Sequence, residues 1–141
     1  MASKRSPVET SRPEAQRNPR FFKTGYFAKQ AGDAGITDDE LCQAGGELEK
    51  GQGDALGGGV WKKRLDKNRH RSIVITKAGM FWIFVILFAK KDRGNISSKE
   101  LAGFKKLAKY YSKTSAAQMD VLLAVGELKE ICHESKSQEG H

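Results

Sequence analysis

Cysteine is scarce in this sequence. Only Cys42 and Cys132 are present, 90 positions apart, with no CxxC pair and no paired histidines beside them. This spacing argues against a zinc site and against a secreted scaffold stapled by disulfides. We therefore expect a protein of the reducing cytoplasm that holds no metal and no cofactor.

Long hydrophobic runs are also missing. The apolar run at residues 80–89 has only ten residues, about half of what a membrane-spanning helix requires. The N-terminus shows no apolar segment typical of a secretory signal. We expect no membrane partner, and we interpret residues 80–89 as a buried central strand.

Proline is confined to positions 7, 13 and 19. The surrounding residues 1–19 contain too little apolar surface to offset the entropy of ordering, which predicts a flexible tail. Residues 134–141 are polar, and we expect them to be disordered. The sequence between these ends, residues 20–133, is of the size of one domain.

Familiar catalytic sets are lacking as well. His70 is the one histidine in the central region, and no carboxylate pair or Ser/His/Asp set can be assembled around it. A lone histidine in a loop is more often a surface residue than a catalyst. The glycine-rich residues 51–59 lack the GxxxxGK[ST] pattern of a phosphate-binding loop, which favours a flexible lead into the next strand. We expect no small-molecule substrate.

Positive charge is abundant instead. The 141 residues carry a formal net charge of +8, with a pI near 9.6. Residues 51–113 hold 15 Lys and Arg against 4 Asp and Glu, a net of +11, whereas the remaining residues sum to −3. A basic centre of this kind indicates a polyanionic partner, with nucleic acid foremost.

Three strands are predicted inside this basic region, at Val60–Leu65, residues 72–77 and residues 80–89. Alternation along the first strand sends Lys62 and Arg64 to one face and Lys63 to the other. The third strand is apolar on both faces, so helices should cover at least one of them.

Helical signals flank these strands. Two capping boxes, Thr37 with Glu40 and Ser97 with Glu100, each precede apolar residues at helical spacing. A short strand at residues 21–22, helical turns at 26–31, a short helix at 115–125 and a last strand or extended arm at 127–132 complete the expected elements.

Lysine and arginine suit one reaction well, the cleavage of RNA. There a 2′-hydroxyl attacks the neighbouring phosphate, and cations stabilise the negative charge that develops on the phosphorane. A lysine crowded by other cations can also assist proton transfer.

Several segments resemble the RelE/HigB-like toxins of bacterial type II toxin–antitoxin systems, within the RelE/ParE superfamily. They are FFKTGYFAKQA, ITDDELCQA, GGGVWKKRL, FAKKDRGNISSKELAGFKKLAK and GELKEI, and they span roughly residues 20–132. The resemblance implies an α+β fold: a small twisted, mainly antiparallel sheet flanked by N-terminal helices and a C-terminal helix.

The same resemblance implies an mRNA interferase, an endoribonuclease that cuts mRNA on the ribosome and inhibits translation, and a helix-turn-helix antitoxin as partner. In this hypothesis arginines clamp phosphate, lysines assist proton transfer, and further residues bind RNA. The phosphate clamp comprises Arg64, Arg71 and Arg93, the proton-transfer group comprises Lys62, Lys90 and Lys91, and the additional RNA-binding residues are Lys63, Lys67, Arg69 and His70.

The chain departs from the family pattern at two places. Relatives usually have a longer Gly/Ser connection ending in GGYR, where this chain has KNRHR, and a Tyr-Gly pair where it has Ile86-Leu87. The absent tyrosine removes a group that could stack on a base. Two other hypotheses therefore stay open: the same fold without nuclease activity, either a ParE-like inhibitor of another target or a degenerate toxin bound by its antitoxin, and a general nucleic-acid-binding module.

Overall fold

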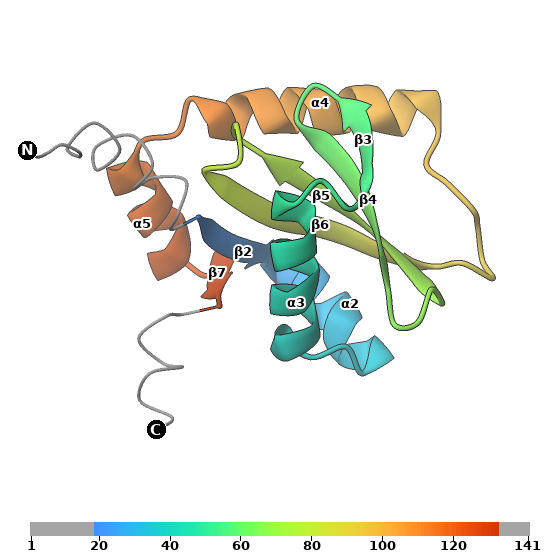
Figure 1. Cartoon of the computed structure of the whole chain (residues 1–141). Helices are drawn as coiled ribbons and strands as arrows, with labels where there is room; N and C mark the ends of the chain where they lie inside the picture. Colours follow the sequence, from blue (N-terminus) through green and yellow to red (C-terminus); the bar gives the residue numbers. More distant parts are fainter. Residues whose placement is uncertain (1–18, 133–141) are drawn as a thin grey trace, which may run out of the picture.

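A computed structural model describes residues 19–132 of the chain. The flexible tail and disordered C-terminus expected from composition lie almost wholly outside this range. Within it, four helices and six strands follow one another (Figure 1). In chain order they are β2 (Arg20–Thr24), α2 (Gly25–Ala34), α3 (Asp38–Glu49), β3 (Asp54–Gly57), β4 (Val60–Leu65), β5 (His70–Thr76), β6 (Phe81–Ala89), α4 (Ser98–Ser112), α5 (Ala116–Ala124) and β7 (Leu128–Ile131).

The six strands form one sheet in the order β3-β4-β5-β6-β2-β7. Strands β3 to β6 form an antiparallel meander, β2 pairs in parallel with β6, and β7 pairs antiparallel with β2. The expected α+β fold with a mainly antiparallel sheet is confirmed. The parallel pairing of β2 with β6 was not predicted; it places the apolar strand β6 in the interior of the sheet.

Helices cover both faces of this sheet, as the apolar character of β6 requires (Figure 1). Phe27 of α2 and Leu41 of α3 pack with Phe84 in one core cluster. On the opposite face, Tyr111 of α4 and Met119 of α5 belong to a second cluster, formed around buried strand residues such as Ile73 and Ile83. We call these the α3 face and the α4 face. Along the described residues 19–132, no helix is both long enough and apolar enough to cross a membrane.

The glycine-rich segment before β4 is more ordered than its composition suggests. Instead of a flexible lead, Asp54–Gly57 forms the edge strand β3, which pairs with β4. The connecting turn uses positive φ angles at three successive glycines, and a Cβ at Gly59 would lie 2.8 Å from the carbonyl oxygen of Thr76. Glycine is therefore required by the tight return of the chain, and the prediction of a flexible lead was wrong.

The two cysteines are joined by a disulfide, although their spacing had argued against a disulfide-stapled scaffold and for a reducing compartment. Cys42 on α3 and Cys132, directly after β7, form a disulfide with a Cα–Cα distance of 5.5 Å. Their separation of 90 residues gave no sign of this, because the pairing depends on α3 packing against the end of β7. The bond ties α3 to the C-terminal end of the described residues, and both cysteines pack against the core on the α3 face.

Both predicted capping boxes lie at helix starts, but only the one at α4 is complete, because the Glu40 carboxylate accepts from the backbone N–H of Asp66. The Thr37 hydroxyl accepts from the backbone N–H of Glu40 at α3, and at α4 the reciprocal bonds between Ser97 and Glu100 are both formed. Arg93 also donates to the Glu100 carboxylate at 3.0 Å. The Arg93 hydrogen bond and then the Ser97 backbone N–H lower the pKa of Glu100 to about 2.

We expect Ser97→Ala to lower the free energy of unfolding by about 1 kcal/mol, because one N-terminal N–H of α4 loses its acceptor. Urea denaturation measures this change, and Ser98→Ala, one residue further on, is the matched control. Equal urea midpoints for the two serine variants would contradict the prediction.

Folding lowers the pKa of Glu100. The stabilising effect of this carboxylate is therefore present above its unfolded pKa near 4.5 and is lost as the pH falls toward about 2.

Candidate nucleic-acid interface

The turn between β4 and β5 has an unusual backbone. Asp66, Lys67 and Asn68 all have positive φ angles, of 55°, 52° and 72°. A left-handed conformation costs a residue other than glycine roughly 1–2 kcal/mol, so such a turn persists only where its surroundings fix it.

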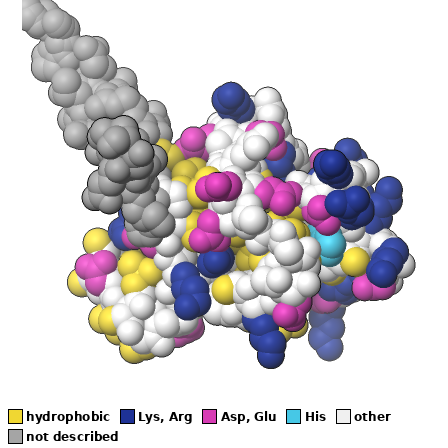
Figure 2. Space-filling view, turned by 90° about the horizontal axis from the view of Figure 1, so that it is seen from below, with side chains coloured by type: hydrophobic (Ala, Val, Ile, Leu, Met, Phe, Trp, Pro, Cys, Tyr) yellow, Lys and Arg dark blue, Asp and Glu magenta, His cyan; other side chains and the backbone are white. Residues whose placement is uncertain are grey.

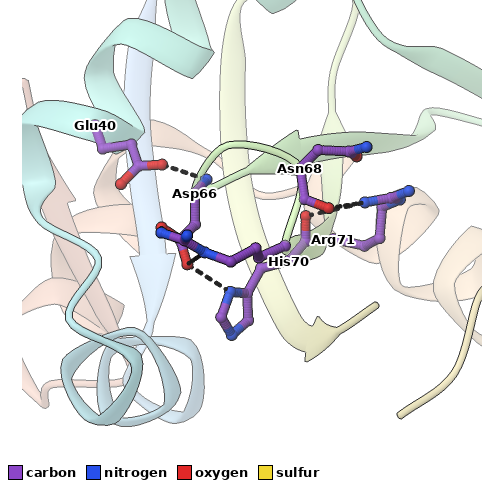
Figure 3. A network of polar contacts seen from close by, with 6 residues as sticks. Glu40, Asp66, Asn68, His70 and Arg71 are labelled. Atoms are coloured by element: carbon purple, nitrogen blue, oxygen red, sulfur yellow. Dashed lines mark hydrogen bonds and ion pairs between the residues drawn. The ribbon is translucent and has the colours of Figure 1, made fainter. Parts of the chain in front are cut away.

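Two side chains fix this turn from outside it (Figure 3). The Glu40 carboxylate on α3 accepts a short hydrogen bond from the backbone N–H of Asp66. Arg71, only 8% exposed, donates to the carbonyl oxygens of Asn68 at 3.0 Å and His70 at 3.4 Å. Arg71 therefore acts as an internal brace, and its guanidinium is committed to the protein backbone.

The Asp66 carboxylate joins two cationic side chains at the same turn. It accepts from Arg69 Nη2 at 2.8 Å and from Nε at 3.2 Å, and it lies 3.0 Å from His70 Nδ1. The hydrogen bond from Arg69, followed by that from His70, lowers the pKa of Asp66. The group is therefore a carboxylate at neutral pH, fixed on both of its oxygens.

A pocket opens beside this turn at the end of the sheet. It has a volume of about 730 Å³ and is lined by residues 66–70 together with Ala89, Lys90 and Lys91. We call it the hairpin-end pocket. His70 is the cross-strand partner of Ala89, which sets its imidazole beside the chain that leads into Lys90 and Lys91. Figure 2 shows Lys and Arg side chains gathered around the exposed histidine surface at this end of the molecule.

The structure brings five of the ten residues predicted from the sequence to this pocket: Lys67, Arg69, His70, Lys90 and Lys91. Four others belong to the α4 face. Arg64 pairs across strands with Arg71, and Arg71 pairs with Phe88, whose ring lies 4.8 Å from the guanidinium carbon of Arg93. Lys62 projects to the same face and donates to Asn95 at 3.3 Å.

The tenth residue, Lys63, lies elsewhere. As alternation predicted, it faces away from Lys62 and Arg64, and it pairs with Glu47 of α3 at 2.8 Å. It also donates to the carbonyl oxygen of Gln52. Its ammonium group thus anchors α3 to β4, on the side of the sheet opposite Arg64.

A comparison with protein-family models matches residues 19–131 to the RelE toxin of the RelE/RelB toxin–antitoxin system. The chain belongs to the RelE toxin family. It is therefore a toxin with an antitoxin as its partner. A search of curated proteins finds no match. The matched range includes all ten residues considered above.

Two residues that contact the turn between β4 and β5 were missed from the sequence. Asp66 was not among the ten predicted residues, although its position four residues before His70 is the one available signal of their pairing. Glu40 was interpreted as a capping residue of α3, and its contact with a turn 26 residues further on has no local signal. Both contacts require the tertiary packing of α3 against β4.

Proposed function

We propose that this RelE-family toxin is an endoribonuclease that cuts mRNA on the ribosome. The observation that supports this most directly is the hairpin-end pocket, where Lys67, Lys90 and Lys91 meet around a space large enough for a nucleotide. No acidic side chain lines it among the described residues except Asp66, which is already bound to Arg69 and His70.

The proposed reaction is transesterification. The 2′-oxygen of one nucleotide attacks its own 3′-phosphate, the bond from phosphorus to the 5′-oxygen of the next nucleotide breaks, and a 2′,3′-cyclic phosphate forms. Lysine ammonium groups stabilise the additional charge on the phosphorane oxygens. Lys62 and Arg64, on the α4 face of the same sheet end, extend the cationic surface along which the RNA backbone can continue.

We further propose that the antitoxin is a small helix-turn-helix protein and that the toxin acts in the cytoplasm, where translated mRNA is found. The helix-turn-helix type follows from the resemblance of the motifs quoted above. An adjoining gene that encodes such a protein, and its co-purification with this chain, would support the proposal.

One observation favours the rival hypothesis of the same fold without nuclease activity. Two of the three arginines expected to clamp phosphate are committed to the protein: Arg71 to backbone carbonyls, and Arg93 to Glu100 and the Phe88 ring. In the rival hypothesis the pocket recognises an anionic surface and no bond is cut.

Primer extension on translated mRNA after a short induction distinguishes these functions. We expect new cuts within ribosome-bound codons, and we expect Lys90→Ala/Lys91→Ala to reduce the cleavage rate by about 10²–10³-fold through loss of charge stabilisation. Lys106→Ala/Lys109→Ala, on the exposed side of α4, removes the same charge and should cut like the wild type. Growth arrest without any new cut would exclude the nuclease.

A further inference from the structure

His70 and Asp66 have the arrangement of a proton-transfer pair. His70 Nδ1 lies 3.0 Å from Asp66 Oδ2. An ionised carboxylate can only accept a hydrogen bond, so Nδ1 carries the hydrogen. In the neutral imidazole this leaves the lone pair on Nε2, the ring nitrogen that does not face Asp66.

The imidazole is held by more than this one bond. Arg69 binds both oxygens of Asp66, and Glu40 and Arg71 fix the backbone on the two sides of the turn (Figure 3). The His70 side chain keeps 20% of its surface exposed and lines the hairpin-end pocket. The turn is strained and is fixed from two sides, and it presents a histidine to a cationic pocket. Neither solubility nor folding requires such an arrangement, and backbone strain of this kind is found preferentially at functional sites.

We infer that His70 is the general base of the cleavage reaction and that Asp66 is its positioning residue. This inference rests on the proposed ribonuclease function and adds to it the group that removes a proton from the attacking hydroxyl. The sequence had assigned proton transfer to Lys62, Lys90 or Lys91 and had treated His70 as an RNA-binding residue.

The step is balanced as follows. His70 Nε2 takes the proton of the 2′-hydroxyl as the 2′-oxygen forms its bond to phosphorus. The bond from phosphorus to the 5′-oxygen breaks, and that oxygen takes a proton from the ammonium group of Lys90 or Lys91. The Asp66 carboxylate, which stays ionised, stabilises the imidazolium that has formed.

A purified translation system with programmed ribosomes, under single-turnover conditions, tests the assignment. We expect His70→Gln to cut about 10²–10⁴-fold more slowly than the wild type, the usual contribution of general acid–base catalysis. The affinity of His70→Gln for ribosomes programmed with an mRNA that has a 2′-deoxy nucleotide at the scissile position should equal that of the wild type. Binding does not involve the proton transfer.

The pH profile separates catalysis from a structural role. The wild-type rate should rise with pH along an acid limb of unit slope, because the base must be deprotonated, and His70→Gln should lose that limb. The charged groups near the imidazole are Asp66, Arg69, Lys67, Lys90 and Lys91, with Glu40 of α3 behind the turn. Lys106→Ala/Lys109→Ala, on the exposed side of α4, is the matched control: it removes charge away from the pocket and keeps the acid limb, because His70, Asp66 and Arg69 remain.

Added imidazole gives a second readout. It should restore part of the activity of His70→Ala, whose truncated side chain leaves room for the free base, and it should leave the rate of Lys106→Ala/Lys109→Ala unchanged. Asp66→Asn should slow cleavage, because the amide no longer imposes one tautomer on His70.

Three results would overturn the inference while leaving the nuclease intact: a fully active His70→Gln, a retained acid limb in that variant, or no response of His70→Ala to imidazole. A wild-type protein that cuts nothing on programmed ribosomes would contradict the proposed function, and with it this assignment.

Discussion

Reduction of the Cys42–Cys132 disulfide should lower the free energy of unfolding by about 2–5 kcal/mol. The bond closes a loop with a sequence separation of 90 residues. Opening it releases the unfolded chain from that constraint, and the chain-entropy model places a loop of this length near the upper end of the range. An effect of this size is a large part of the stability of an ordinary domain.

Urea denaturation with and without dithiothreitol measures the change. The double variant Cys42→Ser/Cys132→Ser should unfold at the midpoint of the reduced wild type, and reductant should not move it. A wild-type midpoint that is the same in both conditions would contradict the prediction. Both cysteines are partly exposed, so the reductant can reach them without prior unfolding.

The disulfide also bears on the compartment. Structural disulfides are rare in the cytoplasm, where thioredoxin and glutathione systems keep thiols reduced. The proposed action on ribosomes therefore requires the dithiol form to fold as well. The site has contacts that do not depend on the bond: α3 is held by the buried side chains Leu41, Ala44 and Leu48, and by the ion pair of Glu47 with Lys63.

The strands of the meander could be predicted closely from local sequence. β4 has the predicted limits Val60–Leu65, and β6 begins one residue after the predicted start at position 80. The helix N-caps Thr37 and Ser97 were also predicted correctly. Strand alternation and helix capping both depend on residues that are close together in the sequence. Strand β3 could not be predicted from the sequence. Its pairing with β4 depends on a turn made of glycines, and its own residues are poor strand formers.

The candidate site was predictable in composition and not in arrangement. The ten residues were chosen by charge and by their places near strand ends, which gave no information about the face of the sheet on which each side chain lies. The pairing register of β5 with its neighbours determines the face. His70 pairs with Ala89 beside Lys90, whereas Arg71 pairs with Arg64 on the opposite face. Figure 3 shows the imidazole of His70 and the guanidinium of Arg71 pointing apart. The contact between Asp66 and His70 depends on the left-handed turn at residues 66–68. The sequence did not indicate this turn, because it contains no glycine.

Arg71 carries the second large expected effect. It is a charged side chain with 8% exposure, and it donates to two carbonyl oxygens of the braced turn. Its truncation leaves these carbonyls without their donor and removes the packing of its aliphatic stem. Three successive left-handed residues then lose one of the two contacts that hold them.

We therefore expect Arg71→Ala to lower the free energy of unfolding by about 2–4 kcal/mol. We also expect it to slow single-turnover cleavage by about 10²-fold or more, because the imidazole beside the turn is no longer held in place.

Arg64→Ala is the matched control, since Arg64 is the exposed cross-strand neighbour and its loss changes the charge equally. Arg64→Ala should leave the urea midpoint nearly unchanged and weaken RNA binding in a salt-dependent way. Arg71→Lys restores the charge without the planar guanidinium and should recover only part of the stability. If Arg71→Ala were as stable as Arg64→Ala, Arg71 would not be a brace of the turn.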